Sequence, residues 1–185
     1  MSKNYPPGWM GKTHAMWTRR RAATGTGFCL PTPMCSSSPT RCAAQCAYAE
    51  AEKADHLVLA APHDHEASRR KDDDGLFQTL FIFGHRPWKI ADPKARDHIG
   101  VGAFNLVRRS TYDAIGTYKA LKMEVLDDMK LGKVIKNAGF AARVVFGEDL
   151  ISLRWANGAF GIVNNFTKNF FALLSFQWWR PLGSV

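Results

Sequence analysis

The strongest constraint on the fold of this chain is an amphipathic segment that begins at two adjacent aspartates, Asp127 and Asp128. Apolar residues follow at helical spacing, and Gly139 stands where a helix C-terminus accepts a residue with positive φ. The apolar positions are Leu131, Val134, Ile135 and Ala138. The pattern predicts a helix over residues 127–138 with one buried face.

Both carboxylates fall in the first turn of this helix. Free backbone N–H groups and the helix dipole favour ionised carboxylates there, so Asp127 or Asp128 could act as a base or orient a cation or hydroxyl. Acidic residues are also ordinary at the starts of helices that carry no chemistry. The motifs on either side of this helix are the evidence that distinguishes the two interpretations.

Short apolar runs elsewhere in the chain predict a buried sheet. His56–Ala61 and Ala141–Phe146 are typical of short buried strands, and Ile99–Arg109 begins a strand with small residues that permit close approach of a ligand or of a packed helix. Ser110–Asp113 has the spacing of a capping box, with Asp in place of Glu, and Gly116 closes the short helix that it predicts. The expected fold class is α/β.

The N-terminal region, residues 5–17, predicts a turn that opens into a short helix. Gly11 and Lys12 stand at its start, where they could approach a phosphate. A P-loop is excluded, because Pro6 occupies the position of a required glycine and no strand precedes it.

Composition places the chain in the globular class, since 185 residues with 46% apolar content suffice for one domain with a core. A net charge of +9 indicates an anionic partner, either nucleic acid, a phosphorylated small molecule or an anionic membrane surface. No signal peptide and no apolar run of bilayer length is visible.

Residues 24–46 have neither strand alternation nor helical periodicity, and they hold all the cysteines. The cysteines are Cys29, Cys35, Cys42 and Cys46. A zinc site is one interpretation, although no Cys-x-x-Cys pair is present, and a loop without regular structure is the other. A basic zinc- or nucleic-acid-binding protein is therefore an alternative function for the chain.

The C-terminal segment, residues 156–185, is aromatic and has few charges. Residues 160–179 suit either an amphipathic helix in a membrane interface or a helix of the core. We treat residues 1–155 as the main domain and residues 156–185 as a membrane-interface tail.

The order of these motifs resembles that of the membrane-associated family 2 glycosyltransferases, which have a GT-A fold. Pro-Gly-Trp-Met-Gly-Lys-Thr-His-Ala is similar to the stretch before their metal motif, and Gly-Val-Gly-Ala-Phe-Asn-Leu-Val-Arg-Arg is similar to their acceptor-side strand. Leu126-Asp127-Asp128 resembles the Thr-Glu-Asp motif. Arg154-Trp155 resembles the end of Gln-x-x-Arg-Trp, with Ile151 in place of the glutamine.

The resemblance implies roles for particular residues. Asp128 would be the general base that deprotonates an acceptor hydroxyl, with Asp127 beside it, and Arg154 and Trp155 would hold the donor and the product. Other substrate contacts are expected at Gly11, Lys12, His14, Gly102 and Ala103. The implied reaction transfers a sugar from a nucleotide-sugar donor, in one step with inversion, at the cytoplasmic face of the membrane. The implied partners include an acceptor such as a lipid and exclude nucleic acid.

Two parts of the family pattern are missing from the chain. One is the N-terminal half that binds the nucleotide base, and the other is the Asp-x-Asp motif that holds Mg²⁺ or Mn²⁺. Regrouped to start one nucleotide earlier, codons for Gly25–Cys35 are compatible with Gly-Asp-Trp-Leu-Leu-Phe-Thr-Asp-Ala-Asp-Val, which contains that motif. We therefore expect residues 24–46 to be a frame-shifted segment, residues 28–40 to be irregular, and the chain as translated to bind no divalent cation.

Overall fold

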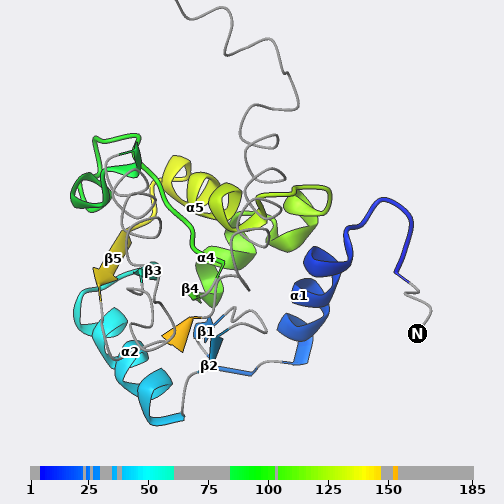
Figure 1. Ribbon diagram of the computed structural model, residues 1–185, viewed down its shortest axis with the longest axis horizontal. Coiled ribbons are helices and arrows are strands. Elements are labelled where there is room, and N and C mark those ends of the chain that lie inside the picture. The colour runs from blue at the N-terminus through cyan, green and yellow to red at the C-terminus, as the bar shows by residue number, and fades with distance from the viewer. Residues whose placement is uncertain are drawn as a thin grey trace, which may run out of the picture.

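The structure is a computed structural model of the chain (Figure 1). It describes residues 5–22, 24–25, 27–29, 35–36, 39–60, 84–102, 104–146 and 152–153. Its helices are α1 Gly11–Ala22, α2 Pro39–Ala51, α4 Arg109–Ala114 and α5 Asp127–Asn137, with the 3-10 helices η1 Pro87–Lys89 and η2 Thr117–Leu121. Its strands are β1 Gly27–Cys29, β2 Cys35–Ser36, β3 His56–Ala60, β4 Asn105–Arg108, β5 Ala142–Phe146 and β6 Ser152–Leu153.

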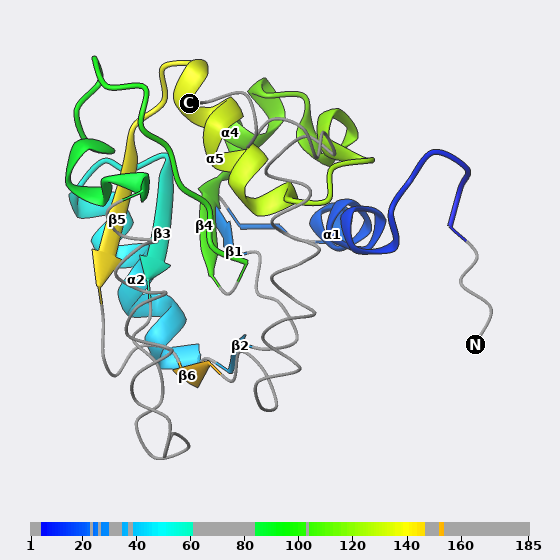
Figure 2. The same ribbon diagram turned by 45° about the horizontal axis from the view of Figure 1, so that its top comes forward.

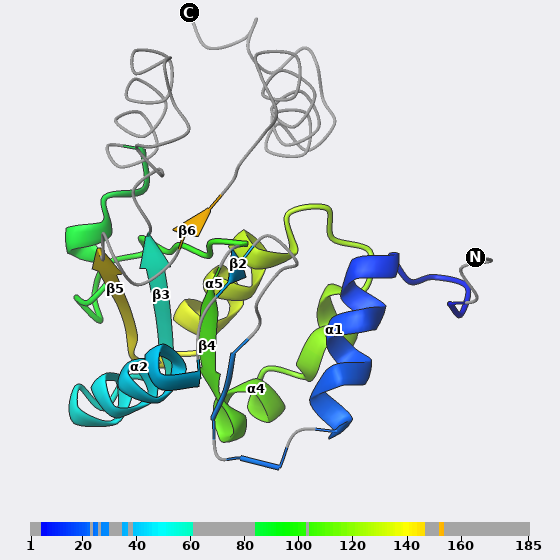
Figure 3. The same cartoon turned by 60° about the horizontal axis from the view of Figure 1, so that its bottom comes forward.

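Four strands form a mixed sheet in the order β1-β4-β3-β5, and β2 pairs separately with β6. β3 and β5 are parallel, with His56 opposite Ala142, while β4 is antiparallel to both of its neighbours (Figure 3). The first four residues of β3 are all buried. Its continuous apolar run follows from this central place, because a strand covered on both faces has no exposed positions.

Helices cover both faces of the sheet (Figures 1 and 2). On one face Leu57 and Leu59 of β3 pack in a buried cluster with Ala49 of α2. On the other face Val107 of β4 packs with Leu131 and Ile135 from the apolar face of α5. The described part of the chain is therefore a mixed α/β fold, as the sequence predicts.

Asp55 joins the ends of three strands. Its backbone N–H donates to the carbonyl of Ala141 at 2.8 Å, and its own carbonyl accepts from the N–H of Arg108 at 2.8 Å. Its side chain repeats both connections, since Oδ2 accepts from Ala141 N at 3.0 Å and Oδ1 accepts from Arg108 Nε at 3.1 Å. One carboxylate thus links β3, β4 and β5.

Most of the predicted elements are confirmed. The strands expected within 56–61, 99–109 and 141–146 are β3, β4 and β5, and the helix expected over 127–138 is α5. Gly139 follows α5 with φ +83°, in the left-handed region that favours glycine, and Gly116 follows α4 with φ +85°.

The capping box predicted at Ser110–Asp113 is wrong. α4 begins one residue earlier, at Arg109, and its N-cap residue Arg108 makes no side-chain cap bond. Asp113 instead forms an ion pair with Arg20 of α1. The sequence signal failed because a tertiary partner competes with the local cap for the same carboxylate.

The expectation that residues 28–40 are irregular is wrong at the positions that the structure describes, while residues 30–34, 37 and 38 lie outside the described residues. Residues 27–29 form β1 and residues 35–36 form β2, while α2 begins at Pro39. A proline suits the first helical position, because the N–H that it lacks has no partner there. β1 is nevertheless an edge strand of the sheet and not a central one.

None of the helices in the described ranges combines the length and apolarity needed to cross a bilayer. The predicted interface helix at residues 160–179, like the rest of the tail at 156–185, lies outside the described residues.

Candidate functional site

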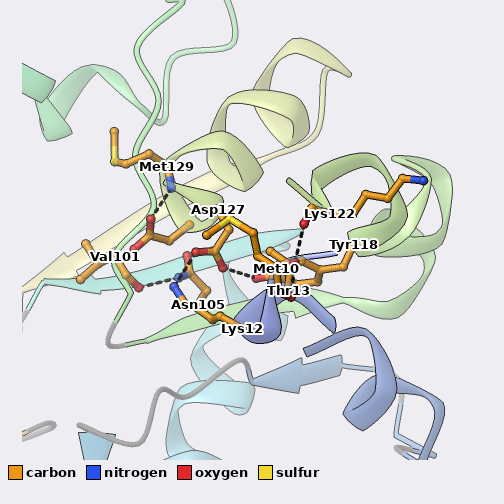
Figure 4. Close-up of polar contacts among 10 residues, drawn as sticks. Met10, Lys12, Thr13, Val101, Asn105, Tyr118, Lys122, Asp127 and Met129 are labelled. Carbon is orange, nitrogen blue, oxygen red and sulfur yellow. Dashed lines mark hydrogen bonds and ion pairs between the residues drawn. The ribbon is translucent and has the colours of Figure 1, made fainter. Parts of the chain in front are cut away.

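The start of α1 is fastened to the end of η2. The backbone N–H of Met10 and the hydroxyl of Thr13 both donate to the carbonyl of Lys122, each at 2.8 Å (Figure 4). Thr13 is 1% exposed, and its hydroxyl lies 3.0 Å from the carbonyl of Met10 as well. This attachment holds the first turn of α1 beside the first turn of α5.

The ammonium of Lys12 reaches Asp127 from this position. Lys12 Nζ lies 2.5 Å from Asp127 Oδ1, and the hydroxyl of Tyr118 lies 3.4 Å from Oδ2 (Figure 4). Asp127 is 1% exposed. Burial raises the pKa of Asp127 above its ordinary value, and the neighbouring Lys12 cation opposes that rise. Asp127 is therefore a buried carboxylate that is ion-paired with Lys12.

Two tyrosines back this pair. The backbone N–H of Tyr118 donates to the hydroxyl of Tyr112 at 2.9 Å, and both side chains are buried. Burial raises the pKa of Tyr112 to about 12 and that of Tyr118 still further. Both phenols are neutral at physiological pH, so Tyr118 presents an O–H donor to Asp127.

Asp128 has a different environment from Asp127. It is half-buried, and Oδ1 accepts a hydrogen bond from the backbone N–H of Met129 at 2.9 Å. It forms no ion pair with any cation in the described part of the chain. An accessible carboxylate without a cation is free to accept a proton from a bound molecule.

The backbone before β4 packs directly on the first turns of α5. A Cβ atom added to Gly100 would lie 1.9 Å from the carbonyl oxygen of Asp128, and one added to Gly132 would lie 2.0 Å from the carbonyl oxygen of Ile99. Neither distance is possible for a real side chain. Of the two uses considered for the small residues in this strand, helix packing is the one observed at Gly100.

A buried polar chain lies under this segment. Asn105 Nδ2 donates to the carbonyl of Val101 at 2.5 Å (Figure 4). This bond turns Asn105 Oδ1 toward His56 Nε2, at 2.9 Å. His56 Nε2 therefore carries the hydrogen, and its buried Nδ1 has no hydrogen-bond partner among the described residues. Burial lowers the pKa of His56 to about 4, and the hydrogen bond that His56 donates to Asn105 only partly opposes this shift. His56 is neutral at physiological pH.

The carboxylates lie at the carboxyl end of β3. α5 leads through Gly139 into β5, which is parallel to β3, so the start of α5 is at the opposite end from the start of β5 (Figure 3). Asn105 begins β4 at that same end, opposite Val58. Ligands of open α/β sheets bind beyond the carboxyl ends of the parallel strands. Asp127 and Asp128 thus occupy the edge where a ligand is expected.

The structure brings together only some of the predicted substrate-binding residues. Lys12 joins Asp127, whereas the ring of His14 lies 5.5 Å from Trp9 and 6.0 Å from Trp17, in an aromatic cluster. Gly11 is exposed at the start of α1, and Gly102 is half-buried in a turn before β4. The remaining predicted residues, Ala103, Arg154 and Trp155, lie outside the described residues.

The described residues do not fit a divalent cation. In those ranges there is no group of three or more His, Cys, Asp or Glu side chains that could hold a metal ion. Of the two carboxylates at the edge of the sheet, Asp127 is already neutralised by Lys12. Asp128 alone offers a single carboxylate, so a cation there would take most of its oxygen ligands from substrate phosphates and water.

Sequence reasoning missed Tyr118, Asn105 and His56 as members of this site. Asn105 carried a signal, because a polar residue inside the apolar run Phe-Asn-Leu-Val is buried in a strand and needs partners. His56 opens an apolar strand and carried the same signal. Tyr118 carried none, since its contact with Asp127 follows from how η2 and α5 pack.

No protein-family model, curated protein or solved structure matches the chain.

Proposed function

We propose that the chain carries the acceptor-side part of a GT-A type glycosyltransferase domain, with Asp128 as the base. The contrast between the two carboxylates supports this proposal. Asp127 is buried and both of its oxygens have partners, Lys12 on Oδ1 and Tyr118 on Oδ2, so an acceptor hydroxyl has no access to it. Asp128 is half-buried and has no cation among the described residues. Asp127 then serves as a positioning residue, because its pair with Lys12 ties α1 to the start of α5.

In the proposed reaction Asp128 removes the proton from an acceptor hydroxyl. The oxygen forms a bond to the anomeric carbon of a nucleotide-activated sugar as the bond from that carbon to the diphosphate breaks. The nucleoside diphosphate leaves with the electron pair, and the configuration of the sugar inverts. The hydrogen bond from Met129 N–H holds Oδ1 of Asp128 in place, and Oδ2 remains to take the proton.

A divalent cation stabilises the diphosphate in the family that the motifs resemble. Because the described residues do not fit such an ion, we assign no step to it. A chain without that stabilisation loses at least about 10²–10³ in rate, judged from the removal of single charge-stabilising groups. Because the Asp-x-Asp motif is missing from its expected place in residues 24–46, we expect slow turnover from this chain.

The proposal includes association with the cytoplasmic face of an anionic membrane, through the aromatic segment 160–179. Aromatic rings favour the headgroup boundary, and Lys168 and Arg180 add attraction to acidic lipids. A peptide of this segment is expected to bind anionic vesicles. A peptide that stays in the aqueous phase contradicts this part of the proposal.

The reaction is tested by incubating the protein with a panel of nucleotide sugars and measuring nucleoside diphosphate release. Asp128→Asn should reduce release by about 10²-fold or more, while the thermal shift caused by the nucleotide sugar persists, since a base acts in the transition state. Glu124→Gln is the matched control, because Glu124 is also a half-buried carboxylate near the start of α5.

Two outcomes contradict the proposal. One is normal turnover by Asp128→Asn. The other is the absence of a thermal shift with every nucleotide sugar, together with stoichiometric zinc in the purified protein, which supports the alternative of a zinc-binding protein.

A further inference from the structure

A cleft of about 580 Å³ lies between the last turns of α1 and the start of η2. It is separate from the carboxylate pair, because Arg21 is nine residues after Lys12 on the same helix, roughly 13 Å along its axis. Its lining residues are Trp17, Arg20, Arg21, Gly116, Thr117 and Lys119. The lining contains three cations and no acidic side chain.

Trp17 forms the fixed wall of the cleft. Its ring lies 5.2 Å from the ring of Trp9 and 6.0 Å from that of His14. These contacts hold the indole in one orientation without any ligand. They also give His14 a structural role, since its ring packs against Trp17 and does not lie beside Asp127 and Asp128.

Two cations from different elements converge on the ring of Trp17. Arg21 Cζ, from α1, lies 5.4 Å from the ring centroid, and Lys119 Nζ, from η2, lies 5.6 Å from it. Neither forms an ion pair with an acidic residue in the described part of the chain. Cation–π attraction at an exposed site is weak and leaves both charges uncompensated.

Arg20 is already neutralised, which distinguishes it from its neighbour. Its Nη2 atom donates to both carboxylate oxygens of Asp113, and the guanidinium lies 5.7 Å from the ring centroid of Tyr112. The pair also neutralises the negative charge of Asp113. The charge left in the cleft is therefore that of Arg21 and Lys119.

The backbone of η2 is held in an unusual conformation where it lines the cleft. Thr117 has φ +63°, which a β-branched residue rarely adopts, and it follows Gly116 with φ +85°. The hydroxyl of Thr117 accepts from the backbone N–H of Lys119 at 3.3 Å. The resulting turn brings Lys119 opposite α1, and strain of this kind persists only where the surrounding structure enforces it.

Basic residues in the last turn of a helix commonly offset the helix dipole, and Arg19, Arg20 and Arg21 are placed to do so in α1. Lys119 lies in the last turn of η2, so it does not offset the dipole of α1. Arg21 and Lys119 line the same cleft, so an anion bound there can meet both charges.

We propose that this cleft binds a phosphate monoester through Arg21 and Lys119. A monoester carries about two negative charges at neutral pH and therefore matches two free cations, whereas a phosphodiester carries one. A guanidinium fork and an ammonium are both common phosphate ligands. The volume exceeds that of a phosphate group and leaves room for its organic part. The inference is independent of the proposed transfer reaction.

The test compares the full chain with Arg21→Gln/Lys119→Gln, and with Lys89→Gln/Lys133→Gln as the matched control. All four side chains are exposed, so each double variant should fold. Both double variants lose two positive charges, and both keep residues 156–185. The probes are glycerol 3-phosphate in solution, and phosphatidylcholine vesicles with either phosphatidic acid or phosphatidylglycerol. Loss of each cation should weaken monoester binding about tenfold, while the control should bind like the parent chain.

The probes distinguish the two sources of the ester. Binding of glycerol 3-phosphate with no preference between the two vesicles identifies a soluble ligand. A preference for phosphatidic acid over phosphatidylglycerol identifies a lipid headgroup. The proposal is overturned if no monoester binds, if both double variants lose binding equally, or if a single-stranded oligonucleotide binds more tightly through the same two residues.

Discussion

Lys12 and Asp127 stand 115 positions apart in the chain, yet Lys12 Nζ lies 2.5 Å from Asp127 Oδ1. The two partners differ in their access to water, because the side chain of Lys12 is 45% exposed and that of Asp127 is 2% exposed. A lysine left without its partner can be rehydrated there, whereas the carboxylate cannot. Removing one partner is therefore not equivalent to removing the other.

Lys12→Met should lower the free energy of unfolding by about 2–3 kcal/mol, since it leaves a buried carboxylate without compensation. Asp127→Asn should cost roughly 1 kcal/mol, because the remaining cation is half-exposed. Urea denaturation of both variants measures the difference. Lys130→Met is the control, since both side chains of its pair with Glu124 are half-exposed and neither is buried, so that the pair should contribute less than about 0.5 kcal/mol. Equal losses at Lys12 and Asp127 would contradict the asymmetry.

The loss in free energy of unfolding caused by Lys12→Met should become smaller as the pH falls. Burial raises the pKa of Asp127, and loss of the cation that opposes this rise moves the pKa further up. A carboxyl with a raised folded-state pKa destabilises the fold above that pKa and stops doing so once it is protonated. Urea midpoints of the variant and the parent chain, compared at pH 7 and at mildly acidic pH, measure the trend. A deficit that widens in acid contradicts it.

Gly100→Ala should destabilise the fold by at least about 1–3 kcal/mol, the range for an overpacked core. The added Cβ would lie 1.9 Å from the carbonyl oxygen of Asp128, so α5 or the strand entry has to move. Thermal unfolding measures the loss. Gly84→Ala is the control, because a Cβ there meets nothing within 4 Å and the backbone has no positive φ. Equal melting temperatures for both variants would show that the contact is absent.

Stability should fall between about pH 6.5 and pH 4 because of His56. Burial lowers its pKa to about 4 in the folded state, while the unfolded state takes up a proton near the ordinary value of 6.5. The unfolded state binds more protons in this window, so acid favours it, by up to about 3 kcal/mol at the lower end. Urea midpoints across this window measure the slope.

His56→Gln should remove most of that slope, whatever its effect on stability at pH 7. His98→Gln is the matched control, since His98 is half-buried at the surface and bonds only to the carbonyl of Arg96 among the described residues. A slope that survives in His56→Gln, or disappears in His98→Gln, contradicts the assignment.

The coding DNA for residues 25–46, read one nucleotide earlier, should encode Asp-Ala-Asp after an apolar strand. An apolar strand followed by paired carboxylates is the arrangement that a cation site at a strand end requires. Sequencing of the coding DNA checks this prediction. A stop codon or the lack of an acidic pair in the shifted frame contradicts it. The strand β1 at Gly27–Cys29 lies at the edge of the sheet, so it is not the central strand that the shifted frame should encode.

Local patterns predicted those elements whose signal is contained in a few consecutive residues. The apolar run at 56–61 gave β3, and the spacing of apolar residues up to Gly139 gave α5. The start of α2 was missed although Pro39 signals a first helical position, because the composition of residues 24–46 suggested irregular structure. The irregular composition of residues 24–46 outweighed the signal from one proline.

The site was only half predictable, for a physical reason. The aspartates and Lys12 were recognisable one by one, but nothing local says that Lys12 neutralises Asp127 and leaves Asp128 accessible. That difference depends on Thr13, which fastens α1 to the carbonyl of Lys122. Contacts between distant segments have no periodicity in the sequence that could reveal them.

The linkage at Asp55 has a consequence for the order in which the chain folds. Its bond to Ala141 spans 86 positions, and the parallel partner of β3 begins only one residue later, at Ala142. At translation rates of about 5–20 residues per second, β3 waits roughly 4–17 s for that partner. During synthesis the most apolar strand of the sheet is therefore shielded on at most one edge, by β4, until residue 142 is made. A ribosome-bound chain that stops before that residue exposes a template for aggregation.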